Sequence, residues 1–132
     1  MQLKEMMSSE VIEQIQREIK ESRGREVLFK GVINTETKKI AAVQVLSRGH
    51  TAATPAITKQ VGPAMVLIHN HPSGHLTPSG ADLRVASLVG NKGAGFFIID
   101  NPVEEGYMVV QPHIPKKRER LKSDNILNFF KP

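Results

Sequence analysis

Two histidines and an aspartate stand at a spacing that suits a metal ion. His69 and His71 lie two residues apart after an apolar run, so on an extended chain their side chains point the same way. Neutral imidazole nitrogens bind zinc at about 2.0–2.1 Å, and a carboxylate oxygen is a common third ligand. Asp82, further along the chain, provides that carboxylate. The pattern predicts one zinc ion per chain, held by His69, His71 and Asp82.

Such a donor set is typical of a catalytic rather than a structural zinc site. Two imidazoles and one carboxylate leave a fourth position open for water. Zinc lowers the pKa of its bound water to about 7, and a nearby glutamate is the natural group to take the proton and return it. Ser79 could donate a hydrogen bond to a developing oxyanion, although its place before a helix also predicts a capping role.

These residues must be positioned by a strand and a helix. Residues 64–68 form a short, wholly apolar run, which predicts a central strand buried on both faces, with His69 and His71 just beyond its end. Ser79 predicts the start of a helix that carries Leu83 and Ala86, with Val89 or Leu88, on its apolar side. The loop between them can fold the start of this helix back over the end of the strand.

The remaining periodicities complete an α/β domain. A helix is expected from about Glu10, capped by Ser8 or Ser9 and ended by Gly24. A short helix over 55–61 is expected after a Thr54 cap. The predicted strands are 27–33 and 40–46, which form a hairpin, the central strand, 95–100 and 107–111. The order α-β-β-α-β-α-β-β predicts a mixed β-sheet flanked by helices.

Composition limits the class of protein. At 132 residues the chain has the size of one domain, and the absence of cysteine excludes disulfides, thiolate metal sites and a cysteine nucleophile. No apolar run approaches the roughly 20 residues that cross a bilayer. We therefore expect a cytoplasmic protein without a membrane segment.

The net charge of +5 is concentrated in the C-terminal segment. Residues 116–132 carry six Lys/Arg against two acidic residues, whereas residues 1–115 carry twelve against eleven. The predicted organisation is a nearly neutral domain, 1–115, followed by a basic linker or tail, 116–132. Residues 116–122 could contact DNA phosphates, although such a run is more often a solvated linker.

The chemistry-bearing residues resemble a known family. His69-x-His71-Pro72, followed by Ser79 and Asp82, matches the JAMM motif of the MPN-plus (JAB) zinc metalloproteases. The strings 69–74 and 77–79, with Arg25-Glu26-Val27 before the first strand, are similar to the bacterial RadC branch. The resemblance covers about residues 10–112.

The resemblance implies roles for the individual residues. The two histidines and Asp82 would bind zinc, Glu26 would be the acid/base, and Ser79 would stabilise the oxyanion. The implied fold is the α/β/α layering of the cytidine deaminase-like group. The implied activity is cleavage of a peptide or isopeptide bond by a zinc-bound water that Glu26 activates, in a DNA-repair context. From residue type alone, Glu26 could equally be a surface glutamate at the start of a strand.

The C-terminal segment carries a second resemblance. Residues 123–132 are similar to the opening of DinG-type helicase regions, which implies a C-terminal helicase domain in a longer protein. The sequence is therefore compatible with three functions. They are a zinc-dependent amide hydrolase, a non-catalytic zinc-containing interaction module, and a nucleic-acid-associated domain that binds through the basic tail.

Overall fold

The computed structural model describes residues 1–49 and 55–116. Five strands form one sheet in the order β2-β1-β3-β4-β5. The strands are β1 (Val27–Ile33), β2 (Ile40–Arg48), β3 (Met65–Asn70), β4 (Gly95–Ile99) and β5 (Gly106–Val110). The helices are η1 (Leu3–Glu5, a 3-10 turn), α1 (Ser9–Glu21), α2 (Pro55–Thr58) and α3 (Gly80–Gly90). β3 and β4 are parallel and joined through α3, whereas the other neighbours are antiparallel, so the predicted mixed sheet is confirmed.

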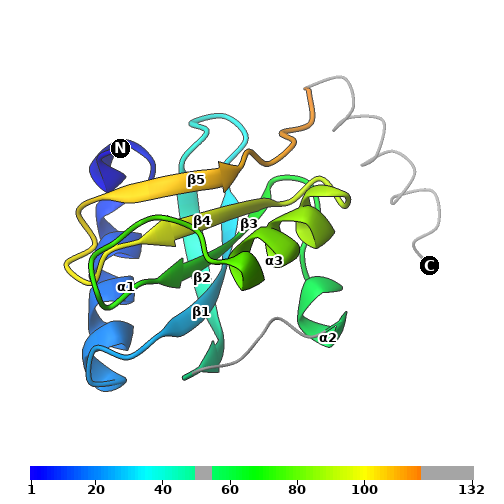
Figure 1. Cartoon of the computed structure of the whole chain (residues 1–132). Coiled ribbons are helices and arrows are strands. Elements are labelled where there is room, and N and C mark those ends of the chain that lie inside the picture. The colour runs from blue at the N-terminus through cyan, green and yellow to red at the C-terminus, as the bar shows by residue number, and fades with distance from the viewer. Residues whose placement is uncertain (50–54, 117–132) are drawn as a thin grey trace, which may run out of the picture.

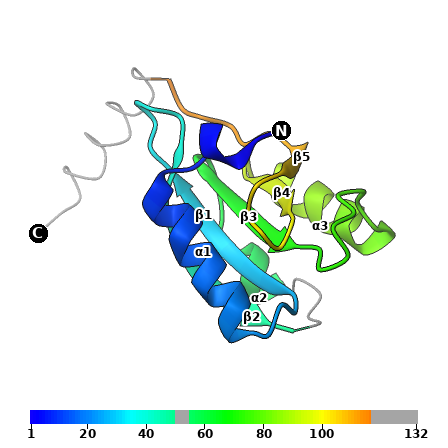
Figure 2. The same ribbon diagram turned by 90° about the vertical axis from the view of Figure 1, so that its left-hand side faces the viewer.

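Helices cover both faces of the sheet. One apolar cluster joins η1 and α1 to one face, and a second joins α3 to the other face, where Ile57 of α2 also packs. Figure 1 shows the strands passing between these layers, and Figure 2 shows α1 and α3 on opposite sides of the sheet. The predicted α/β/α arrangement is therefore confirmed. The turn η1 was not predicted from the sequence.

The first helix forms as its sequence signals predict. Ser8 is the N-cap, and its side chain accepts a hydrogen bond from the Val11 backbone N–H at 3.3 Å. Val11, Ile15 and Ile19 are buried on one side of the helix. Gly24 has a φ of +75°, a conformation that suits glycine after a helix, and its N–H donates to the Ile19 carbonyl.

The central strand is longer than the apolar run predicts. Val66, Leu67 and Ile68 are 0% exposed, which confirms a strand buried on both faces. The strand continues through Asn70, because His69 pairs with Leu28 of β1 and with Ile98 of β4. His69 therefore lies inside β3 and is held from both sides, rather than beyond the end of the strand.

The prediction for the apolar side of α3 is wrong at Leu83. Leu83 is 55% exposed, and the inward side consists of Asp82, Ala86 and Val89. Successive helical residues are about 100° apart, so an inward Asp82 turns Leu83 away from the sheet. Leu88 is also exposed, which selects Val89 from the two predicted alternatives. Hydrophobicity could not reveal this because a polar residue occupies the inward position.

Some sequence predictions fall on residues that the structure does not describe. Thr54, the predicted cap of α2, and nearly all of the basic tail 116–132 lie outside the described residues. The domain boundary at 115 and the DNA contact through 116–122 therefore stay predictions. Within the described ranges, the helices are too short or too polar to cross a membrane.

Candidate metal centre

The structure brings the three predicted metal ligands together at the end of β3 and the start of α3. The Nε2 atoms of His69 and His71 lie 3.0 Å apart. Asp82 faces both rings, with Oδ1 3.1 Å from His69 Nε2 and Oδ2 3.1 Å from His71 Nε2. One donor atom from each residue can be chosen so that all three lie within 4.8 Å of one another. The arrangement confirms that this group could hold a metal ion.

The donor separations fit a small tetrahedral ion. Two ligands at about 2.0–2.1 Å from a tetrahedral zinc ion lie roughly 3.3 Å apart. The imidazole nitrogens are 3.0 Å apart, close to that value, and each carboxylate oxygen lies 3.1 Å from a different ring nitrogen, Oδ1 from His69 and Oδ2 from His71. Imidazole and carboxylate donors also match the chemistry of zinc. The residues present therefore fit the metal that the sequence predicts, although its identity stays a prediction.

A backbone carbonyl sets the tautomer of His71. Its Nδ1 lies 2.7 Å from the His75 carbonyl oxygen, which can only accept a hydrogen bond. Nδ1 must therefore carry a proton, and Nε2, which faces Asp82 and His69, is the nitrogen available to a metal ion. Metal-binding histidines commonly use such a contact to fix the ring and its tautomer. The His75 side chain is exposed, so its contribution to the site comes from its backbone.

Burial favours the neutral form of His69. Its ring lies beside Phe96 of β4, with ring centroids 5.9 Å apart. Desolvation by burial lowers the pKa of His69 below 6.5, and this outweighs the opposing attraction of Asp82. The neutral imidazole is the form that binds a metal ion, so the environment of His69 favours ligation near neutral pH.

Asp82 is a buried carboxylate held by the helix that it helps to begin. It is 7% exposed, and its Oδ2 accepts a hydrogen bond from the Ser79 backbone N–H at 2.8 Å. The Ser79 hydroxyl in turn accepts from the Asp82 N–H at 3.0 Å, which forms a capping box. Burial alone would raise the pKa of Asp82, but the Ser79 hydrogen bonds and the electrostatic interaction with the His69 ring lower it below 3.8.

The capping role predicted for Ser79 is therefore confirmed. Its hydroxyl oxygen is occupied as an acceptor, but the hydroxyl proton can still be donated because one O–H group does both. Its predicted role as an oxyanion donor is compatible with this geometry and stays a prediction.

Glu26 lies at the edge of the predicted metal ligands. Its side chain is 28% exposed, and Oε2 is 4.0 Å from His69 Nδ1, too far for a direct hydrogen bond. The strand register brings it there, because the β1–β3 pairing starts at Leu28 opposite His69. Its position beside the ligands, with access to solvent, is suitable for a general base, and this role stays a prediction.

The sequence interpretation missed Asn70, which lies between the two histidine ligands. Its side chain is fully buried and forms hydrogen bonds with the backbone of Arg25 and Val27 and with the side chain of Asn101. Asn101, in the turn after β4, also donates a hydrogen bond to the Gly24 carbonyl. The available signal was a single amide directly after His69 in a strand whose other residues are apolar, on the face opposite His69.

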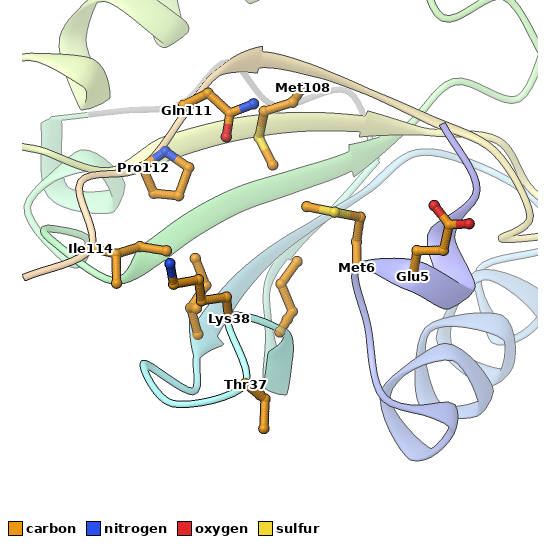
Figure 3. A pocket seen from close by; sticks show the side chains of 10 residues that line it. Glu5, Met6, Thr37, Lys38, Met108, Gln111, Pro112 and Ile114 are labelled. Atoms are coloured by element: carbon orange, nitrogen blue, oxygen red, sulfur yellow. The ribbon is translucent and has the colours of Figure 1, made fainter.

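A hollow in the described part of the chain lies at the other end of the sheet from the predicted metal ligands. Figure 3 shows a pocket lined mainly by apolar side chains, including Met6, Met108 and Ile114, with Lys38 at its side. Ile33, which also lines it, donates a hydrogen bond to the Ala64 carbonyl just before the start of β3, whereas the two predicted histidine ligands lie at the other end of that strand. The pocket is therefore separate from the metal centre.

The fold and the site identify the class of protein. A five-stranded mixed sheet between helices, with two histidines and an aspartate at one end of the central strand, is the arrangement expected of a JAB domain. A family model for the RadC-like JAB domain matches residues 6–98. Because that match spans most of the chain, the protein belongs to the RadC-like JAB domain family.

Comparison with solved structures identifies a similar JAB1/MPN domain protein from Archaeoglobus fulgidus. The two share 16% sequence identity with a TM-score of 0.46, and the match covers 80% of this chain and 94% of that one. Curated protein sequences give no significant match to this chain.

The lowered pKa of His69 predicts that the metal-free protein becomes less stable in mild acid. The unfolded chain takes up this proton near pH 6.5, before the folded chain does, so stability is full above that pH and declines below it. Asp82 adds a similar loss below about pH 3.8. Urea unfolding with EDTA should give a lower midpoint at pH 5 than at pH 7.5.

Two variants test the source of this pH dependence. His69→Asn should weaken it, whereas His75→Asn, at an exposed loop position, should retain it. An unchanged pH dependence in His69→Asn would show that another group is responsible.

Proposed function

We propose that this protein is a zinc-dependent hydrolase that cleaves a peptide or isopeptide bond. One observation carries the proposal. His69, His71 and Asp82 present their donor atoms to one point, and a partly exposed glutamate lies beside them, with Glu26 Oε2 4.0 Å from His69 Nδ1. Metal ligands alone would suit a structural site, but an acid/base group at their edge is useful for moving protons.

The division of chemistry follows from the positions of the residues. A zinc ion held there would supply Lewis acidity, which acidifies water and polarises a scissile carbonyl. Glu26 takes a proton as water adds to the carbonyl carbon, and gives it to the leaving amine as the C–N bond breaks. The Ser79 hydroxyl donates a hydrogen bond to the oxygen that gains negative charge.

The environment of the ligands supports this role. Asp82 is buried and its Oδ2 is fixed by the Ser79 N–H, while the His75 carbonyl fixes the His71 ring. Ligands held in this way need little rearrangement when the metal binds or the reaction proceeds. Glu26, by contrast, is more exposed, which leaves it accessible to water and substrate.

The direct test is a peptide-library cleavage screen read by mass spectrometry. We expect cleavage that stops when a chelator removes the metal and returns when zinc is restored. Isopeptide-linked substrates belong in the same screen, because the geometry does not distinguish the two amides. A zinc-loaded protein that cleaves neither class would support the non-catalytic interaction module instead.

A further inference from the structure

Two asparagine side chains hold the backbone segment that carries Glu26. Asn70, at the end of β3, is 0% exposed. Its Oδ1 accepts a hydrogen bond from the Val27 N–H at 2.7 Å, and its Nδ2 donates to the Arg25 carbonyl at 3.1 Å. These two bonds lie immediately before and after Glu26. A single amide therefore fixes the backbone on both sides of the proposed base.

Asn101, in the turn after β4, extends the same network. Its Oδ1 accepts from Asn70 Nδ2 at 2.7 Å, and its Nδ2 donates to the Gly24 carbonyl at 2.9 Å. The Val27 N–H can only donate, and the two backbone carbonyls can only accept. The orientation of both amides is therefore determined, because either flip would place like groups together.

The strand pairing explains why a side chain is needed here. The β1–β3 ladder begins with Leu28 opposite His69, so Val27 lies just before its first pair. Val27 is fully buried, and an unpaired buried N–H would be costly. Asn70 supplies the partner that the ladder lacks at this point.

The end of β3 contacts both the metal-ligand side of the site and the segment that carries Glu26. Adjacent residues of a strand point to opposite faces, so His69 and Asn70 project in opposite directions. His69 is directed to Asp82 of α3, and Asn70 to the segment before β1. Any shift of β3 would therefore move a metal ligand and the Glu26 backbone together.

We infer that Asn70, supported by Asn101, is a positioning residue that keeps Glu26 at the edge of the metal centre. The inference rests on the proposed function, in which Glu26 moves the proton. A purely structural amide would affect stability and leave turnover of the folded protein unchanged. A positioning residue lowers kcat in the folded, zinc-loaded protein, because small displacements of a catalytic group slow the reaction strongly.

The first experiment compares two asparagines that both bind backbone amides. Asn70→Ala in the full chain should lower kcat by about 10–100-fold, with KM and zinc content unchanged. The control is Asn34→Ala, at the other end of β1. Its Oδ1 accepts from the Glu36 and Thr37 N–H groups at 2.8 and 3.2 Å, and its loss should leave kcat unchanged. Equal kcat in wild type and Asn70→Ala, or an equal fall in both variants, would overturn the inference.

Amide hydrogen exchange gives a readout that needs no substrate. In Asn70→Ala, the Val27 amide should exchange at least about tenfold faster than in wild type, while amides of the β3–β4 pair keep their protection. Unchanged protection of Val27 would overturn the inference. If the wild-type protein cleaves no amide, the proposed hydrolase function fails, while exchange still decides whether Asn70 orders the Glu26 segment.

A second variant covers the case in which Asn70→Ala does not fold. Asn101→Ala removes the contacts to Asn70 and Gly24 but leaves both bonds from Asn70 to the Glu26 segment. It should lower kcat and speed exchange of the same segment, each by less than the loss of Asn70. If neither kcat nor amide exchange changed in Asn101→Ala, Asn101 would have no part in positioning Glu26.

Discussion

Replacing Glu26 with glutamine should lower kcat for zinc-dependent cleavage by about 10²–10⁴-fold, the range typical for loss of a general acid/base. Glutamine has nearly the same size and keeps the hydrogen-bonding shape, but its amide cannot take a proton from water at neutral pH. Glu26 is not among the three metal ligands, so the zinc content should remain that of wild type. The measurements are steady-state kinetics and metal analysis of the same sample.

Glu36→Gln is the matched control for this variant. Glu36 is an exposed glutamate in the turn between β1 and β2, at the far end of β1 from the metal ligands. The same chemical change there should leave kcat within a factor of about two, as for surface changes away from a site. Wild-type turnover in Glu26→Gln would remove Glu26 from the mechanism, even if chelation still abolished activity.

The parts of the site that depend on local geometry could be predicted from sequence. The alternation of side chains along a strand is sufficient to place His69 and His71 on one side, and their Nε2 atoms are 3.0 Å apart. Ser79 before a helix predicts a cap, and the capping box confirms it. Asp82 is the acidic residue of that box. Each of these inferences needs only a few consecutive residues.

The position of Glu26 depends on contacts between distant residues. It reaches the site because β1 pairs with β3 in the register that sets Leu28 opposite His69. Sequence periodicity predicts both strands but not their pairing or register. Only the family resemblance linked Glu26 to the ligands before the fold was known.

The contacts that support the site through backbone groups could not be predicted from the sequence, for a different reason. The His75 carbonyl that holds His71 would be present with almost any residue at that position. Asn70 and Asn101 form hydrogen bonds with backbone carbonyl and N–H groups of residues 24–27. Almost every residue type has these groups, so the residue types at 24–27 do not indicate the contacts. Leu83 was misplaced because the hydrophobic pattern ignores a polar ligand that faces inward.

Loss of a metal ligand should abolish zinc binding and the stability that zinc provides. We expect wild type to bind one zinc ion per chain, and His69→Ala to bind none at the same free zinc concentration. When free zinc is 100-fold above the Kd, binding should raise the free energy of unfolding of wild type by about 2.7 kcal/mol. His69→Ala should show no such rise. Metal analysis and urea unfolding, each with and without zinc, measure the two effects.

Two further variants separate ligand loss from structural damage. His75→Ala removes an exposed imidazole from the same loop but keeps the carbonyl that holds His71, so zinc binding should persist. Ser79→Ala removes the helix cap, which should cost about 1 kcal/mol of stability while zinc still binds. If His69→Ala kept its zinc, or if His75→Ala lost it, the ion would be held by other ligands. The hydrolytic role of Glu26 would then lose its structural basis, because the proposal requires the metal to lie beside His69.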